Sequence, residues 1–202
     1  MTPKEVAQKA CTEWFAYQNP FELEMALTVV DKIKPRIIME LGTAHGASLA
    51  AWAEIAKPEL TISLDPEDIP RTLEQKASFE NLCKTYKFER IPFYDRNENA
   101  QRLLEVILNG RKIDFMFIDG AHEFESVLFD FYTYKKFMAP NGVVGFHDII
   151  YNEVLADAGS TVSWFWDRLI TRYHYDIFYE HSTMGIGFIY LNLPVLPSKH
   201  EL

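Results

Sequence analysis

The chain alternates short apolar runs with longer segments in which apolar residues recur at helical spacing. The apolar runs predict buried strands at residues 35–42, 60–65, 87–93, 112–119 and 142–148. The helical spacing predicts helices at residues 47–57, 71–86 and 99–110, and another that ends near residue 137. Because apolar strands that alternate with helices build βαβ units, this pattern predicts an α/β fold with a parallel sheet covered on both faces.

The two ends of the chain depart from this alternation. After a helix expected at residues 162–170, the runs at 173–179 and 184–192 are joined by a short connection, which predicts an antiparallel hairpin. Before the first strand, two amphipathic stretches lie at about 3–17 and 20–33. With 202 residues the chain suits one structural domain. We expect residues 1–34 to form a helical cover and residues 35–202 to form the sheet domain.

Composition excludes several classes of protein. Apolar residues make up 48% of the chain and aromatic residues 14%, which is typical of a globular protein. Its 20 Lys and Arg against 29 Asp and Glu give a net charge of −9, which argues against a nucleic-acid partner. No apolar run approaches the roughly 20 residues that span a bilayer, so we expect no membrane association. We also expect no signal peptide, reduced thiols at Cys11 and Cys83, and a cytoplasmic location.

The loop after the first strand reads ELGTAHGAS over residues 40–48. Gly42 and Gly46 allow a backbone to approach a ligand closely, although a structural turn would also use them. Position 44 is Ala44, so the dinucleotide pattern G-x-G-x-x-G is absent. Asp65 ends the second strand, where α/β sheets use an acid to accept ribose hydroxyls; a turn or a helix cap is its alternative interpretation.

This order of landmarks resembles the class I S-adenosylmethionine-dependent methyltransferases over residues 35–191. The resemblance implies a Rossmann-like sheet of seven strands, mostly parallel, with an antiparallel C-terminal hairpin and helices on both faces. It implies that the glycine loop lies beside the methionine part of the cofactor, that Asp65 binds the ribose, and that Asp95 contacts the adenine. The full set of cofactor-binding residues that it implies is Glu40, Gly42, Thr43, Gly46, Ser48, Asp65, Asp95 and Asp119.

The fourth and fifth strands end in acids and imidazoles. Asp119 and His122 follow the fourth strand in FIDGAH, and His147 and Asp148 end the fifth in FHD. Parallel neighbours bring their carboxyl ends to one edge, so the carboxylates of Asp119 and Asp148 should converge there and repel or share a cation. His122, with a reference pKa of about 6.5, could act as general base. A helix cap for Asp119 and a packing role for His147 remain alternatives.

These two motifs resemble cephalosporin-hydroxylase-like proteins and macrolide sugar O-methyltransferases, and more distantly the catechol-type O-methyltransferases. The resemblance implies a Mg²⁺ or Mn²⁺ ion held by Asp119, His147 and Asp148, with Asp119 and His122 in catalysis. The catechol-type enzymes usually have acid followed by acid or Asn on strand five, so the pair His147-Asp148 departs from their pattern.

The sequence therefore predicts O-methylation of a small hydroxylated molecule by an S-adenosylmethionine-dependent enzyme, assisted by a divalent cation. A sugar, a phenol and an amine are all open as acceptors, and a homo-oligomer is possible. Two alternatives stay open. One is an oxidoreductase that binds a nicotinamide nucleotide, which the missing middle glycine disfavours. The other is a catalytically silent module that binds the cofactor or a partner.

Overall fold

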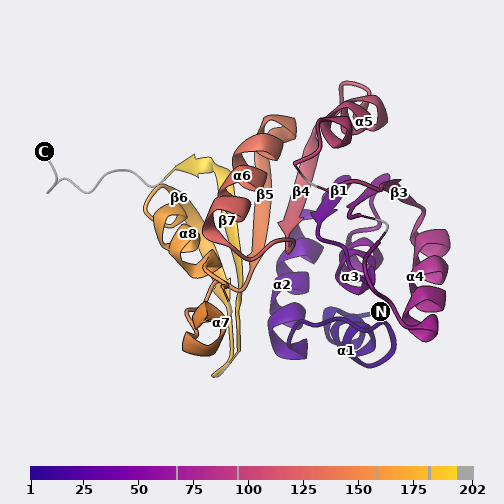
Figure 1. Ribbon diagram of the computed structural model, residues 1–202, viewed down its shortest axis with the longest axis horizontal. Coiled ribbons are helices and arrows are strands. Elements are labelled where there is room, and N and C mark those ends of the chain that lie inside the picture. Colours follow the sequence, from indigo (N-terminus) through magenta and orange to yellow (C-terminus); the bar gives the residue numbers. More distant parts are fainter. Residues whose placement is uncertain (67, 95, 158, 182, 195–202) are drawn as a thin grey trace, which may run out of the picture.

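One sheet of seven strands organises the described part of the chain, which comprises residues 1–66, 68–94, 96–157, 159–181 and 183–194 of the computed structural model (Figure 1). The strands are β1 (Ile37–Leu41), β2 (Leu60–Leu64), β3 (Phe88–Ile91), β4 (Ile113–Ile118), β5 (Met138–His147), β6 (Tyr173–Phe178) and β7 (Ile186–Pro194). Their order in the sheet is β3-β2-β1-β4-β5-β7-β6. Strands β1 to β5 pair in parallel, whereas β7 pairs antiparallel with both β5 and β6. The predicted mostly parallel sheet with an antiparallel C-terminal hairpin is confirmed.

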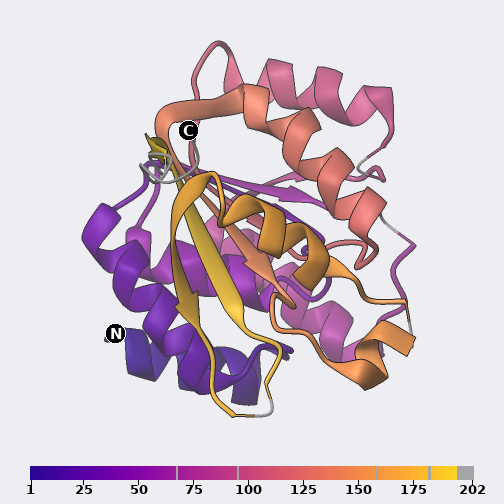
Figure 2. The same cartoon turned by 90° about the vertical axis from the view of Figure 1, so that its left-hand side faces the viewer.

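Strand composition follows position in the sheet. Every residue of β1 is buried, and β4 is buried except at the half-buried Asp114, because helices cover both faces of these central strands. The edge strands instead expose polar or aromatic side chains, namely Glu89 and Arg90 in β3 and His174 and Tyr175 in β6. Figure 2 shows β6 and β7 at the outer edge of the molecule. Charged side chains on an edge strand disfavour pairing with another chain.

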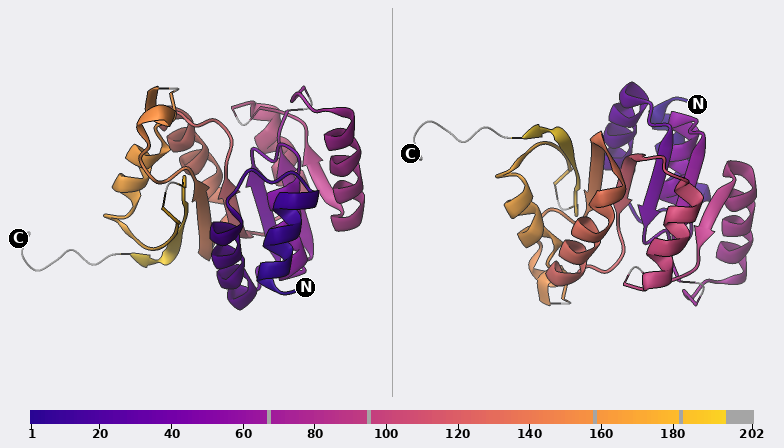
Figure 3. Two further views of the ribbon diagram at one scale, coloured as in Figure 1. Left: turned by 90° about the horizontal axis from the view of Figure 1, so that it is seen from below. Right: turned by 90° about the horizontal axis from the view of Figure 1, so that it is seen from above.

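Helices cover both faces of the sheet, as Figures 1 and 3 show. One face carries α1 (Pro3–Glu13), α2 (Pro20–Ile33) and α3 (Ala47–Ala56), with α4 (Leu73–Tyr86) beside them. The other face carries α5 (Glu98–Leu108), α6 (Phe124–Tyr134), the 3-10 helix η1 (Lys135–Phe137) and α8 (Val162–Leu169). A short helix, α7 (Glu153–Asp157), precedes α8 and was not predicted. None of the helices in these described ranges is long and apolar enough to cross a membrane.

The core of the first face is built around Trp52 of α3, which is fully buried. Its ring centroid lies 5.4 Å from that of Phe115, 5.1 Å from that of Phe117 and 6.3 Å from that of Phe188. Aromatic pairs at such separations contribute about 0.5–1.5 kcal/mol each beyond the area they bury. Trp52 therefore fixes α3, and with it the loop before α3, against β4 and β7.

The predicted start of the fifth strand at residue 142 was wrong, because β5 already begins at Met138. Pro140 and Gly142 are residues that typically end a helix and delay a strand. In the structure Pro140 and Asn141 are exposed, and the pairing with β4 shifts register between Ile113 and Phe115. A proline is tolerated in a strand at such an irregularity, where its missing N–H is not needed.

A close approach of two loops sets the geometry at the carboxyl ends of β1 and β4. Gly42 follows β1 with a φ of 82°, and an added Cβ there would lie 2.2 Å from the carbonyl oxygen of Asp119. Two hydrogen bonds fix this approach: the Gly42 N–H donates to the Leu64 carbonyl at 3.0 Å, and the Asp119 N–H donates to the Leu41 carbonyl at 2.9 Å.

We expect Gly42→Ala to lower the free energy of unfolding much more than Gly110→Ala. Both glycines have a left-handed φ (82° and 79°), so both variants carry a strain of about 1–2 kcal/mol. Only at Gly42 does the added methyl group also meet backbone atoms, because nothing lies within 4 Å of a Cβ at Gly110. Chemical denaturation of the two variants measures the difference, and equal losses would contradict the close approach.

Candidate functional site

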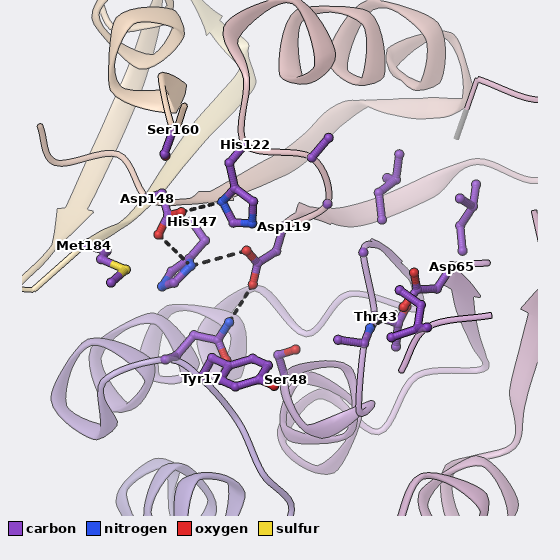
Figure 4. A pocket seen from close by; sticks show the side chains of 18 of the residues that line it. Tyr17, Thr43, Ser48, Asp65, Asp119, His122, His147, Asp148, Ser160 and Met184 are labelled. Atoms are coloured by element: carbon purple, nitrogen blue, oxygen red, sulfur yellow. Dashed lines mark hydrogen bonds and ion pairs between the residues drawn. The ribbon is translucent and has the colours of Figure 1, made fainter. Parts of the chain in front are cut away.

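A cavity of about 840 Å³ opens at the carboxyl ends of β1, β2, β4 and β5 (Figure 4). Its volume lies within the range of roughly 300–1,000 Å³ that is usual for small-molecule sites. The walls include residues 41–44 after β1, 64–66 after β2, 119–123 after β4, 147–148 at the end of β5, and 16–18 from the N-terminal segment. The strand order changes direction between β1 and β4, which is where open α/β sheets bind ligands.

The glycine loop contributes one wall of the cavity. Gly42, Thr43 and Ser48 line it, whereas Glu40 and Gly46 lie behind the lining. Glu40 is fully buried and accepts a hydrogen bond of 2.6 Å from the Ser48 hydroxyl. Burial raises the pKa of Glu40 well above its usual value. Glu40 therefore reaches the cavity only through Ser48.

The glycine at position 46 is explained by the packing of α3 against α4. It is the N-cap of α3 with a φ of 80°, and an added Cβ would lie 2.9 Å from the ring of Phe79. The glycine therefore lets α3 begin close to α4.

Asp65 lies at the cavity wall, close to the glycine loop. Its carboxylate accepts a hydrogen bond from the backbone N–H of Ala44, and a guanidinium nitrogen of Arg71 lies 4.0 Å away. Burial raises the pKa of Asp65 to about 6, and the Ala44 N–H and the charge of Arg71 only partly oppose this. Asp95, predicted at the adenine, lies outside the described residues; the neighbouring Tyr94 lines the cavity.

The acids and imidazoles of β4 and β5 meet at the opposite wall (Figure 4). Ile118 pairs with Phe146 in the parallel register, so Asp119 and His147 extend from neighbouring strands side by side. Asp148 then has a left-handed φ of 59°. Its Oδ2 lies 2.5 Å from Nδ1 of His122, which approaches from the loop after β4.

His147 lies between the two carboxylates. Its Nδ1 is 3.3 Å from Oδ1 of Asp119 and 3.1 Å from Oδ1 of Asp148, and its side chain is only 7% exposed. Burial lowers the pKa of an imidazole, but here the charge of Asp119, its hydrogen bond and the charge of Asp148 outweigh burial and raise the pKa of His147 to about 9.

The remaining pair, His122 and Asp148, is hydrogen-bonded and open to the cavity on the histidine side. The His122 side chain is 47% exposed and the Asp148 side chain 5%. The hydrogen bond to Asp148 raises the pKa of His122 above its usual value. Burial would raise the pKa of Asp148, yet the hydrogen bond from His122 and the charge of His147 lower it. The proton of this pair therefore resides on the imidazole.

The N-terminal segment also contributes to this site, which no sequence pattern indicates. Gln18 is buried, and its Nε2 donates a hydrogen bond of 2.6 Å to Oδ2 of Asp119 across 101 positions of sequence. Tyr17 also lines the cavity, and its ring centroid lies 5.2 Å from that of His45. No local pattern marks a residue whose partner is so distant in sequence, so the sequence alone does not predict these residues.

The predicted cation ligands do not fit a divalent ion in this arrangement. Gln18 donates to Oδ2 of Asp119 and His122 contacts Oδ2 of Asp148, while Nδ1 of His147 lies between the two Oδ1 atoms, of which that of Asp148 has no hydrogen-bond partner among the described residues. Within the described ranges, no cluster of three or more His, Cys, Asp or Glu side chains has a geometry that could hold a metal ion. The imidazole of His147 lies between the carboxylates of Asp119 and Asp148.

One curated protein shares sequence with this chain at a recognisable level. An uncharacterized protein of Acanthamoeba polyphaga mimivirus is 33% identical over 118 residues, which are 54% of this chain and 50% of that protein. The match therefore spans about half the length of the relative.

Several solved structures share the fold at low sequence identity. A protein assigned as a caffeoyl-CoA O-methyltransferase from Staphylococcus aureus has a TM-score of 0.65 at 15% identity, over 94% of this chain and 92% of that one. An O-methyltransferase from Bacillus cereus, solved with SAH, has a TM-score of 0.58 at 17% identity, over 94% and 90%. The MycE methyltransferase of mycinamycin biosynthesis, solved with Mg, SAH and mycinamycin VI, has a TM-score of 0.61 at 14% identity, over 94% and 54%.

A family model decides the assignment. Residues 39–149, more than half of the chain, match the family described as "Methyltransferase domain". The match begins in β1 and ends just after Asp148, so it contains the glycine loop, Asp65 and the cluster of acids and imidazoles. This chain therefore belongs to the family of methyltransferase domains, as its resemblance to the class I enzymes predicted.

Proposed function

We propose that the protein is an S-adenosylmethionine-dependent O-methyltransferase that acts on a small hydroxylated molecule. One observation carries the proposal: a single cavity joins the glycine loop and Asp65 at one wall to the His122–Asp148 pair at the other. The proposed cofactor site and the proposed base, His122, thus line the same cavity. The solved relatives from Bacillus cereus and mycinamycin biosynthesis, both in complex with SAH, support the choice of cofactor.

The residues at the first wall fit the proposed cofactor. Gly42 lines this wall, and its missing Cβ lets the backbone of Asp119 and Gly120 pack directly against it, which brings the loops after β1 and β4 together here. Thr43 and Ser48 present hydroxyls, and Asp65 presents a carboxylate that can accept both hydroxyls of a ribose. The cofactor, when bound, supplies an electrophilic methyl group on a sulfonium. The protein's part is then to orient the acceptor and remove its proton.

His122 is the residue suited to remove that proton. Asp148 is ionised and accepts the Nδ1–H of His122, so in the neutral form of the ring the other nitrogen, Nε2, carries the lone pair. Nε2 can take the proton of an acceptor hydroxyl as the oxygen attacks. Asp148 holds the ring in this tautomer and stabilises the imidazolium that forms. A neutral amine attacks without prior loss of a proton, so a built base favours a hydroxyl acceptor.

Assistance by a divalent cation stays a prediction of the sequence. The donor atoms do not fit one in the observed arrangement, and the proton transfer to His122 uses only side chains of this chain.

Calorimetry with purified protein should show binding of S-adenosylmethionine and of SAH. The affinity should weaken as the pH falls through about 6, because Asp65 must be ionised to accept the ribose hydroxyls and its pKa is raised to about 6. Below that pH the loss approaches about tenfold per pH unit. Asp65→Asn should bind about ten- to a hundredfold more weakly at pH 8, since it lacks a charge-assisted hydrogen bond.

The Asp65→Asn variant is also the control for the pH dependence, because it should lack the part of the decline between pH 7 and pH 5 that Asp65 causes. If the affinity of the two proteins for the cofactor depended on pH in the same way, Asp65 would not be the residue that binds the ribose. Failure of the wild type to bind either compound would remove the proposed cofactor. A larger thermal shift with NAD than with S-adenosylmethionine would favour an oxidoreductase instead.

Replacing His122 by alanine should lower kcat by about 10²- to 10⁴-fold, because that is the usual contribution of a positioned base. Affinity for the cofactor should change little, since His122 lies at the opposite wall from Asp65. Methyl transfer to a panel of phenols and sugars, followed with labelled cofactor, measures the rate. His174→Ala is the matched control, because His174 is exposed on β6.

A His122→Ala variant as fast as the wild type would contradict the role of His122 as base. If the wild type bound the cofactor but transferred no methyl group to any acceptor, the protein would be a silent binding module.

A further inference from the structure

We propose that His147 takes the place of a divalent cation in this site, so that the protein transfers methyl groups without a bound metal ion. The inference rests on the proposed function and concerns how the same site is held together. His147 acts in it as a positioning residue, which orients Asp119 and Asp148 and through Asp148 the base His122.

The His147 imidazole occupies the place that a shared ion would need. Its Nδ1 lies 3.3 Å from one carboxylate and 3.1 Å from the other, and each contact involves the Oδ1 atom. An ion that bridged these same two oxygens would need the position that Nδ1 of His147 holds. The His147 side chain is only 7% exposed, so its neighbours enclose the ring in this position.

The two carboxylates need positive charge or N–H donors at this point. The ends of β4 and β5 force them together in a spot where the Asp119 side chain is 13% exposed and that of Asp148 is 5% exposed. Such a pair needs a cation or donors to persist. Nδ1 of His147 lies between the two Oδ1 atoms, while Gln18 donates to Oδ2 of Asp119 and His122 contacts Oδ2 of Asp148. Within the described part of the chain Oδ1 of Asp148 has no hydrogen-bond partner, so Nδ1 of His147 is the nitrogen placed nearest to it.

The identity of residue 147 also disfavours a hard ion. An acid or an amide at this position would supply an oxygen, which is what Mg²⁺ and Mn²⁺ prefer, whereas an imidazole is a poorer ligand for these ions. Residue 147 therefore offers an ion no oxygen ligand, and its ring nitrogen Nδ1 instead contacts the Oδ1 atoms of Asp119 and Asp148. The mycinamycin enzyme, which shares the fold at 14% identity, was solved with Mg, so the proposal concerns the residues of this chain and not the fold.

Binding of Mn²⁺ to the wild-type protein, followed by electron paramagnetic resonance, tests the inference without any turnover. We expect the wild type to bind no stoichiometric Mn²⁺, and its methyl transfer to be unchanged by EDTA. His147→Glu replaces the imidazole by a third carboxylate, so it should bind Mn²⁺ about tenfold or more tightly than the wild type, because affinity follows the charge of the ligand set. His174→Glu, on exposed β6, adds the same charge elsewhere and should not.

His147→Asn keeps the inference testable should the glutamate variant fail to fold. It leaves the two carboxylates with a neutral side chain, so methyl transfer should fall and added Mg²⁺ should restore part of it. Stoichiometric Mn²⁺ binding by the wild type, or loss of its activity in EDTA with recovery in Mg²⁺, would overturn the inference. A wild type that binds no cofactor or shows no turnover would instead contradict the proposed function. The two failures can be told apart, because Mn²⁺ binding is measured independently of cofactor binding and turnover.

Discussion

The convergence of two buried carboxylates at the ends of β4 and β5 is the constraint on which the site depends. Two like charges about 4 Å apart repel by roughly 4 kcal/mol at an effective dielectric constant of about 20. Asp119 and Asp148 are held together nonetheless, because the parallel register of their strands fixes the backbone. The two histidines and Gln18 supply the nitrogens that surround these carboxylates, and only Oδ1 of Asp148 among their four oxygens is buried without a hydrogen-bond partner in the ranges that the structure describes. The positions of the acids and imidazoles at this wall of the cavity thus follow from the pairing of β4 with β5.

The same constraint ties the N-terminal helices to the chemistry. Gln18 lies between α1 and α2, and its hydrogen bond to Asp119 is one of the contacts that satisfy the cluster. These helices pack on α3, whose Trp52 in turn contacts β4 and β7. Residues 1–34 therefore contribute both to the core and to a wall of the cavity, and their removal would leave a buried carboxylate oxygen without its donor.

The strands and the sheet edge at which the site lies can be predicted from the sequence, whereas contacts between distant segments cannot. Asp119, His122 and Asp148 are expected at one edge because parallel strands must end together, and the hairpin is expected from its short connection. Gln18 is missed because its partner is 101 positions away, and the early start of β5 is missed because the irregular pairing that admits a proline leaves no local pattern. The position of the His147 ring between two carboxylates depends on side-chain rotamers, which no spacing encodes. The burial of Glu40 behind Ser48 is of the same kind.

The charge of the cavity favours binding of one form of the proposed cofactor over the other. Asp65, Asp119 and Asp148 line it with carboxylates, and burial raises the pKa of Asp65 to about 6 although the charge of Arg71 partly opposes this, so negative charge is costly there. S-adenosylmethionine carries a positive sulfonium that its product lacks, so transfer of the methyl group removes one positive charge from the cofactor. An acidic enclosure therefore attracts the donor more strongly than the spent product. An imidazole at position 147, which adds less charge than a divalent ion, preserves this difference, whereas a metal would weaken it.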